Sequence, residues 1–284
     1  MSSFQLPQKA GIGIKAQHYE HITQNKPDIA WFECHPENYF GNGGPAHYFL
    51  DKIAQDYPLS MHGVGLSLGS ANGIKDNHLK QLKRLIDIYQ PAVFSEHLAW
   101  CENNNQYFND LLPLPYSEES LKIFIENINK TQDVLQRQIL IENPSIYIRL
   151  PNQISEVEFL NEAVKQTGCQ LLLDINNVYV SAFNLEFDPK LYLNQFPADA
   201  VKEIHLAGHS DQTLDNQAVK IDDHGSKVCD DVWHLYKGFI NKHGAIPTQI
   251  EWDTNTPDLP IWLDEANKAN VILDQVSKTK EVSC

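Results

Sequence analysis

Short apolar runs alternate with amphipathic stretches along almost the whole chain, and this alternation predicts its secondary structure. Eight short runs have the length and apolar character of buried strands. They cover residues 11–16, 29–35, 59–65, 92–98, 138–143, 170–176, 202–208 and 247–253. Each of them ends in one or more polar residues, which becomes important once the fold is considered.

The stretches between the runs carry the marks of helices. Leu79 begins a set of apolar residues at helical spacing, and Ser117 is followed by two glutamates that suit a helix N-terminus. Ser155 and Glu158 have the spacing of a capping box, and Gly168 is placed to end the same helix. Helices are expected at 77–90, 117–135, 155–168 and 230–244.

Strand followed by helix, repeated eight times, predicts a (β/α)8 TIM barrel of the α/β class. A doubly wound open sheet is the alternative, but no G-x-G-x-x-G motif follows the first strand to support it. No linker divides the chain. We therefore expect one domain over 1–284, with a core at about 10–265 and a C-terminal helix and tail at 266–284.

Composition and charge argue against several classes of function and of site. The formal net charge of the 284 residues is −15, and without a basic run this charge disfavours nucleic-acid binding. No apolar stretch is long enough for a membrane span, and the N-terminus lacks the pattern of a signal peptide, so a cytoplasmic protein is expected. The 5 cysteines are scattered without a C-x-x-C pair, which argues against a thiolate zinc site or a disulfide scaffold.

The polar residues at the strand ends are all histidine, aspartate or glutamate. In a TIM barrel the C-terminal ends of the strands form the active site. Six consecutive strands supply His62, His97, Glu142, Asp174, His205 and Glu251, and the second strand adds Glu33 and His35. Imidazole and carboxylate are the usual ligands of divalent metals, so this pattern predicts a metal centre.

Taken one at a time, these residues have simpler explanations. A lone histidine is more often a hydrogen-bonded core or rim residue, and a lone strand-end aspartate often caps the next helix. Their convergence favours a metal centre over these separate explanations, because each buried charge left unpaired would cost several kcal/mol. Asn177 follows Asp174 by three residues, and Asp222 and His224 are two apart in a predicted loop, so they extend the same site.

Nine sequence motifs resemble those of the multinuclear non-haem iron-dependent oxidative enzymes, a family that includes the methanobactin-biosynthesis oxidases. The motifs are HPENYFGNGGP, MHGVGLSLGS, SEHLAW, NDLLPLPY, IENPS, LLLDINNVYVSA, EIHLAGH, IDDHGS and IEWD. The resemblance covers about residues 10–265. It implies a xylose-isomerase-like barrel whose metal plan is similar to that of endonuclease IV.

The resemblance also implies a ligand plan. The first metal takes His62, His97 and Glu142, and Glu142 bridges to a second metal. The second metal is also held by Asp174, His205 and Glu251. A third takes Asp222, His224 and Asn177, where the endonuclease plan has a histidine; Asn176 is the alternative to Asn177. His209 is expected to act in acid–base catalysis or to support a neighbouring ligand.

The implied chemistry is oxidation of peptide cysteines by dioxygen at two or three iron ions of mixed valence. Zinc or manganese also suits the ligand types. Members of the family make oxazolone-thioamide groups or excise a carbon from a C-terminal cysteine of a ribosomally made precursor peptide. They usually work with a small partner protein that recognises the leader, and we expect a separate partner here.

Three other functions remain open. An endonuclease IV-like phosphodiesterase shares the metal plan, although the charge of −15 disfavours it. A metal-dependent sugar isomerase would want a lysine at the strand ends, and we identify none. A metal-storage or scaffold barrel is the non-enzymatic alternative. The segments 35–49 and 101–116 are expected to be loops that overhang the site and contact the peptide.

Overall fold

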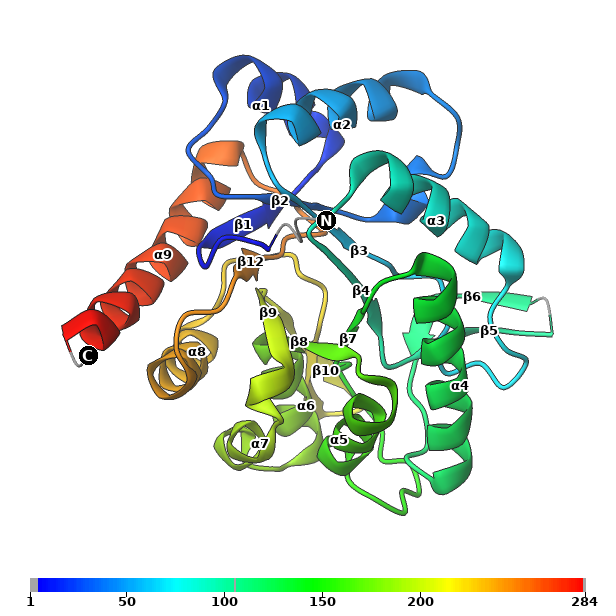
Figure 1. Ribbon diagram of the computed structural model, residues 1–284. Helices are drawn as coiled ribbons and strands as arrows, with labels where there is room; N and C mark the ends of the chain where they lie inside the picture. The colour runs from blue at the N-terminus through cyan, green and yellow to red at the C-terminus, as the bar shows by residue number, and fades with distance from the viewer. Residues whose placement is uncertain (1–4, 105, 283–284) are drawn as a thin grey trace.

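Eight parallel strands close into a barrel in the computed structural model, which describes residues 5–104 and 106–282 (Figure 1). Around the barrel the order is β1, β12, β9, β8, β7, β4, β3, β2, and β1 pairs with both β2 and β12. This closure confirms the TIM barrel and rules out the open sheet. The strands are Ala10–Gly13, Phe32–Cys34, Leu59–His62, Val93–His97, Leu140–Glu142, Gln170–Asp174, Val201–Leu206 and Thr248–Ile250, numbered β1, β2, β3, β4, β7, β8, β9 and β12.

All eight predicted strands exist, but each ends one to three residues earlier than predicted, and at the sixth strand the structure shows why. The sixth strand was expected to continue to Asn176, whereas β8 ends at Asp174 and helix α6 (Ile175–Leu185) begins at once. The cause is a helix cap, since Asp174 Oδ1 accepts a hydrogen bond from the backbone N–H of Asn177 at 2.6 Å. Asn176 and Asn177 therefore lie in the first turn of a helix.

The four predicted helices are confirmed as α3 (Asp76–Tyr89), α4 (Glu118–Leu135), α5 (Glu156–Thr167) and α8 (Asp230–His243). Ser117 and Ser155 both cap their helices with capping boxes, and Gly168 ends α5 with a φ of 68°. The other elements are α1 (Tyr19–Asn25), α2 (Gly44–Asp56), α7 (Pro189–Gln195), α9 (Leu259–Val282) and 3-10 turns at Ala16–His18, Pro36–Tyr39 and Ala198–Ala200.

The C-terminal helix α9 packs on the outside of the barrel and starts earlier than the predicted residue 266. Its inner face buries Trp262, Ala266, Ala269 and Leu273 completely or nearly so, close to β1 and β12. The indole N–H of Trp262 donates to the carbonyl of Ile250 in β12 at 2.8 Å. The last two residues of the predicted tail lie outside the described residues.

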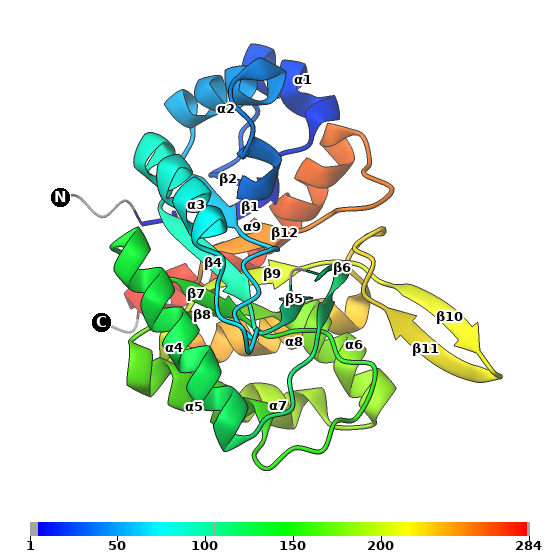
Figure 2. The ribbon, with the colours of Figure 1, turned by 90° about the vertical axis from the view of Figure 1, so that its right-hand side faces the viewer.

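Two β-hairpins stand at the end of the barrel where the strands finish, opposite the N-terminus (Figure 2). One consists of β5 (Trp100–Asn103) and β6 (Gln106–Leu112), the other of β10 (Ser210–Leu214) and β11 (Gln217–Ile221). The prediction of a plain loop at 101–116 was therefore wrong. The segment 35–49 is also partly helical, because it contains the turn Pro36–Tyr39 and the start of α2.

Cys34, Cys101, Cys169 and Cys229 are free thiols, and Cys284 lies outside the described residues. Among the residues described, no helix combines the length and the apolar character needed to cross a bilayer.

Candidate metal centre

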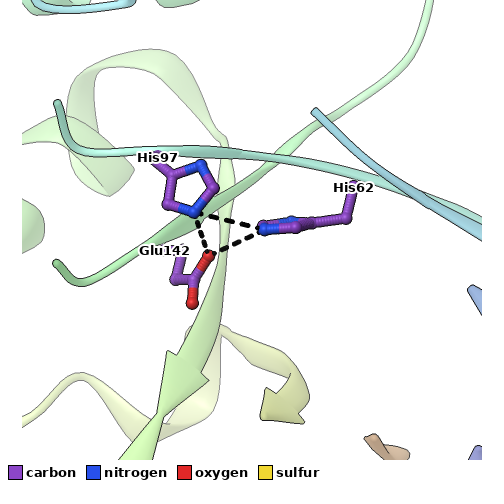
Figure 3. A group of neighbouring side chains, drawn as sticks. All are labelled: His62, His97 and Glu142. Atoms are coloured by element: carbon purple, nitrogen blue, oxygen red, sulfur yellow. Dashed lines mark hydrogen bonds and ion pairs between the residues drawn. The ribbon is translucent and has the colours of Figure 1, made fainter. Parts of the chain in front are cut away.

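His62, His97 and Glu142 come together at the ends of β3, β4 and β7 (Figure 3). Glu142 Oε2 lies 3.1 Å from His62 Nε2 and 2.9 Å from His97 Nε2, and the two ring nitrogens are 3.2 Å apart. The carbonyl of Gly63 lies 3.1 Å from His97 Nδ1, and Ser95 Oγ lies 2.7 Å from His62 Nδ1. Both rings therefore present Nε2 to Glu142, which is the arrangement that a metal-binding histidine requires.

A second group shares Glu142 with the first. It consists of Glu142, Asp174, His205 and Glu251, all buried, with ligand atoms within 4.8 Å of one another. His205 Nδ1 lies 3.1 Å from Glu251 Oε2 and 3.8 Å from Glu142 Oε1. Glu142 thus directs Oε2 at the first group and Oε1 at the second. A carboxylate with one oxygen on each side is suited to bridge two cations.

Asp174 Oδ2 and Asn177 Oδ1 are among the buried oxygens of this site that have no hydrogen-bond partner. A buried polar atom without a partner costs about 1–3 kcal/mol, and native proteins rarely leave one without a reason. A divalent cation bound between the carboxylates would satisfy both oxygens, so the residues present fit a metal centre.

Electrostatics of the site point the same way. Burial alone would raise the pKa of Glu142, but His97 and His62 hold it well below its usual range. Burial, and next the charge of Glu142, hold the pKa of Asp174 well above its usual value. Carboxylates crowded this closely repel one another, and bound cations would relieve that repulsion.

Asp222 and His224 approach the second group from the loop after β11. His224 Nε2 lies 2.7 Å from Asp222 Oδ1, and His224 Nδ1 lies 3.4 Å from Glu251 Oε2. The two asparagines differ in position: Asn176 Nδ2 donates to Asp222 Oδ1 at 2.6 Å, whereas Asn177 Nδ2 lies 3.5 Å from Glu142 Oε1. Asn177 thus lies beside the bridging glutamate, and Asn176 contacts the Asp222–His224 pair.

A cavity of about 340 Å³ opens above these groups. The predicted residues that line it are His62, His97, Glu142, Asn177, Asp222, His224 and Glu251. Asp174 and His205 lie deeper and are fully buried. From the two segments expected to overhang the site, Asp110 and Leu111 of β6 and His35 line the cavity.

Comparison with known proteins shows which family the chain belongs to. The model of the RiPP precursor modification enzymes MbnB/TglH/ChrH, where RiPP denotes a ribosomally synthesised and post-translationally modified peptide, matches residues 9–274. The chain belongs to this family. It is a family of peptide-modifying metalloenzymes, so a precursor peptide is the substrate class and the buried His/Asp/Glu groups are candidate metal ligands.

Close relatives carry names that say nothing about activity. A UPF0276 protein of Vibrio vulnificus is 46% identical over 274 residues, which is 96% of this chain and 94% of the relative. A UPF0276 protein of Rhizobium meliloti is also 46% identical, over 94% of this chain and 87% of the relative. Both matches extend across nearly the whole barrel.

Solved structures show the fold. Endonuclease IV from Thermus thermophilus is 14% identical with a TM-score of 0.57, covering 95% of this chain and 99% of that one. A D-psicose 3-epimerase solved in the presence of D-fructose is 11% identical with a TM-score of 0.57, covering 92% and 95%. These similarities confirm a xylose-isomerase-like, endonuclease IV-like barrel.

His209, the predicted catalytic residue, does not line the cavity. Its Nδ1 contacts Asn176 Oδ1 at 2.9 Å, and its Nε2 lies 3.1 Å from Lys220 Nζ. This position behind Asn176 favours the supporting role over direct acid–base catalysis on a substrate.

Sequence reasoning missed a group at the rim of the cavity. Asp253 lies 2.6 Å from Lys15 Nζ, 3.0 Å from His224 Nδ1 and 3.7 Å from His35 Nε2. The expectation that no lysine stands at a strand end was wrong, because Lys15 lies two residues past the end of β1. It forms an ion pair with Asp253, however, and is not among the residues that line the cavity. Lys15 was within the predicted first strand, so it could have been noticed.

Below His205 lies a buried pair of carboxyl groups, of which the strand pattern identified Glu33 but not Glu203. His205 Nε2 is 3.4 Å from Glu33 Oε1, and Ser60 Oγ is 2.8 Å from Glu33 Oε2 and 3.2 Å from Glu203 Oε2. Burial, and then the charge of Glu33, raise the pKa of Glu203 to about 8. The Glu33 carboxylate thus faces Nε2 of His205, and Nδ1 of the same ring is directed toward Glu251.

Gly208 sets the position of the loop that carries Asp222 and His224, because a Cβ there would collide with the backbone carbonyl of Ser226. We expect Gly208→Ala to lower the free energy of unfolding by about 1–3 kcal/mol, as overpacking does elsewhere. Urea unfolding measures the change. Gly238→Ala in α8 is the matched control, since its Cβ meets nothing within 4 Å and should be neutral or stabilising. Equal effects of the two substitutions would contradict the packing argument.

Proposed function

We propose that the chain is an iron- and dioxygen-dependent oxidoreductase that modifies cysteine residues of a ribosomally synthesised precursor peptide. Membership of the family supports a peptide-modifying enzyme; iron and cysteine oxidation are the finer part of the proposal. The observation that carries it is the pair of ligand groups that share Glu142 at the base of an open cavity. Two metal ions on one carboxylate suit an oxidase that needs one ion for substrate and another for oxidant.

The proposed ligands follow the groups described above. His62, His97 and Glu142 would hold the first ion, and Glu142, Asp174, His205 and Glu251 the second. Asp222, His224 and Asn177 would complete a third site, which an amide ligand makes weaker. Imidazole and carboxylate without thiolate suit iron, and zinc and manganese also suit them. Bound iron would bind the substrate thiolate at neutral pH and supply one-electron chemistry toward dioxygen.

The residues of the chain itself would bind and orient the peptide. A cavity of about 340 Å³ has room for one or two side chains, so an extended peptide segment, rather than a folded domain, would enter it. Leu111 and Tyr147 line its sides and would exclude water from the reacting cysteine. The carbonyl of His62 can only accept, so His35 Nδ1 donates to it at 3.1 Å. In the neutral ring Nε2 is then unprotonated, and it would take up a proton on the side that faces Asp253.

We also propose that a separate small partner protein recognises the peptide leader. In residues 5–104 and 106–282 the barrel, its covering helices and the two short hairpins account for the described elements. Asp110 and Leu111 of β6 line the cavity, and so does Asp222 just after β11, so a partner docked on the hairpins could present the peptide there.

A phosphodiesterase is the alternative that the fold allows. Endonuclease IV has a similar fold, but at 14% identity the similarity is evidence for the fold only. A net charge of −15 would also repel a phosphate backbone. A sugar isomerase would need a lysine that projects into the cavity, whereas Lys15 forms an ion pair with Asp253.

Oxygen consumption tests the proposed activity. Iron-loaded protein purified without oxygen would be mixed with a cysteine-containing peptide encoded near its gene, together with the partner protein if one is encoded there. We expect oxygen uptake and a change in peptide mass, and no reaction with the Cys→Ser peptide. Hydrolysis of a phosphodiester without oxygen uptake would replace this proposal with the alternative.

Metal binding is expected to release protons. Burial would lower the pKa of His97, His205 and His224, but their carboxylate neighbours raise it above its ordinary value, so we expect these rings to bind protons more readily in the metal-free protein than free imidazole does. A metal ion must displace these protons. Calorimetric titration of Zn²⁺ in phosphate and in Tris should show about two or more protons released per chain at pH 7.5, and metal affinity should fall at lower pH. Equal enthalpies in the two buffers would contradict protonated ligands.

A further inference from the structure

A continuous chain of polar contacts runs from hairpin β10–β11 to Asp222. Lys220 Nζ in β11 lies 3.1 Å from His209 Nε2, and His209 Nδ1 lies 2.9 Å from Asn176 Oδ1. Asn176 Nδ2 then lies 2.6 Å from Asp222 Oδ1. We call Lys220, His209 and Asn176 the Lys220 relay.

The chemistry of each group fixes the direction of every hydrogen bond in the relay. An ammonium group donates and cannot accept, so His209 Nε2 must be the acceptor toward Lys220. The ring is then protonated on Nδ1, which donates to the carbonyl oxygen of Asn176. With its oxygen engaged, Asn176 turns its NH₂ group toward Asp222, whose carboxylate accepts. Reversing any one of these bonds would place two donors or two acceptors against each other.

We infer that Lys220 fixes the tautomer of His209 and thereby orients Asn176, so that Lys220, His209 and Asn176 are positioning residues for Asp222. The relay also separates the roles of the two asparagines. The oxygen of Asn176 is taken up by His209, whereas Asn177 Oδ1 is buried, has no partner and belongs to a residue that lines the cavity. Asn177 is therefore the asparagine available to a metal ion.

Lys220 is held firmly enough to play this part. It is only 8% exposed, its ammonium lies 2.7 Å from Asp211 Oδ1, and it sits over the ring of Phe183 at 4.9 Å. The side-chain amide of Asn184 bonds to both the N–H and the carbonyl of Lys220, at 3.0 and 2.9 Å. Burial, and then the charge of Lys220, lower the pKa of His209, which favours the neutral ring.

The tautomer can be measured without any metal. In ¹⁵N-histidine-labelled, metal-free protein at pH 7.5, the ¹⁵N shifts of His209, assigned through the backbone, should show a protonated Nδ1 and an unprotonated Nε2. This is the less common tautomer of a free imidazole, so the result is specific to the relay. A protonated Nε2, alone or in an imidazolium, would overturn the inference.

The effect on Asp222 is tested with Lys220→Met, Lys220→Arg and the control Lys227→Met, which removes the same charge from an exposed position. In Lys220→Met we expect a mixture of His209 tautomers. We also expect the Zn²⁺ ion that Asp222 would bind to be held about 10–100-fold more weakly, which is the usual range for groups that support metal ligands. Lys220→Arg, which also only donates, should retain the wild-type tautomer and affinity. An unchanged tautomer and unchanged Zn²⁺ binding in Lys220→Met would overturn the inference.

The last step of the inference rests on the proposed function, because it treats Asp222 as a metal ligand. The two can fail separately. If wild-type protein binds no Zn²⁺ but shows the expected tautomer, the relay stands and the metal centre fails. If Zn²⁺ binds normally and His209 has the other tautomer, the metal centre stands and the relay fails.

Discussion

Glu142→Ala is expected to remove two metal ions per chain and to lower turnover by at least about 1,000-fold, which corresponds to about 4 kcal/mol of lost transition-state stabilisation. Glu142 is the one carboxylate common to both ligand groups, with Oε2 near His62 and His97 and Oε1 near His205. Its loss would also leave the two histidines of the first group without their buried counter-charge. Metal analysis by mass spectrometry and turnover of the peptide measure the two effects.

A matched control is needed because a buried substitution can also unfold the protein. Glu126→Ala removes a glutamate from the exposed face of α4 and should change neither metal content nor turnover. Glu142→Gln keeps the shape of the side chain and should still lose most of the metal. A folded Glu142→Ala protein with full metal content would contradict the assignment of Glu142 as the bridge.

His97→Ala has a narrower expected effect, and this difference makes it informative. His97 belongs to the first ligand group and not to the second, which consists of Glu142, Asp174, His205 and Glu251. We expect about one metal ion per chain to be lost, the second to be retained, and turnover to fall by at least about 1,000-fold because both ions are needed. His21→Ala, on the exposed surface of α1, serves as the control.

The metal count decides how the first two sites are related. Loss of one ion in His97→Ala and of two in Glu142→Ala would support two sites joined by one carboxylate. Loss of the same number of ions in both variants would show instead that the two ligand groups fill and empty together as a single unit. Full turnover in His97→Ala would contradict its place at the centre.

Much of the barrel and the strand-end cluster could be predicted because both depend on local patterns. Each strand is a short apolar run, and the capping boxes at Ser117 and Ser155 mark helix starts within a few residues. Parallel strands of a barrel end on one face, so chain order alone predicts that the residues at those ends, such as His62 and Glu142, lie together. That they bind metal stays a prediction until it is measured.

Features that depend on contacts between distant segments could not be predicted in this way. The hairpin at β5–β6 has no clear alternation of apolar and polar residues, since most of β6 is exposed or half-buried. The strand after Gln170 ends at Asp174 only because its side chain caps α6. Lys220 is buried by Tyr179 and Phe183, which lie on another element about 40 residues earlier in the chain, so its sequence neighbourhood does not reveal the contact.

The choice between Asn176 and Asn177 shows the same limit. The three-residue offset from Asp174 favoured Asn177, but that offset reflects the first turn of helix α6, where the sequence had predicted strand as far as Asn176. What distinguishes the two amides is hydrogen bonding: His209 engages the oxygen of Asn176, and the oxygen of Asn177 is free. Only the folded chain contains that information.

The central claim, an iron centre held by residues at the strand ends, is tested most directly by metal analysis with Mössbauer spectroscopy. The protein would be purified without oxygen from cells grown on iron-57. We predict two or more iron ions per chain with the spectrum of a magnetically coupled cluster, lost in Glu142→Ala. Tightly held zinc, with no iron taken up on reconstitution, would contradict the oxidase and direct attention to phosphodiester substrates.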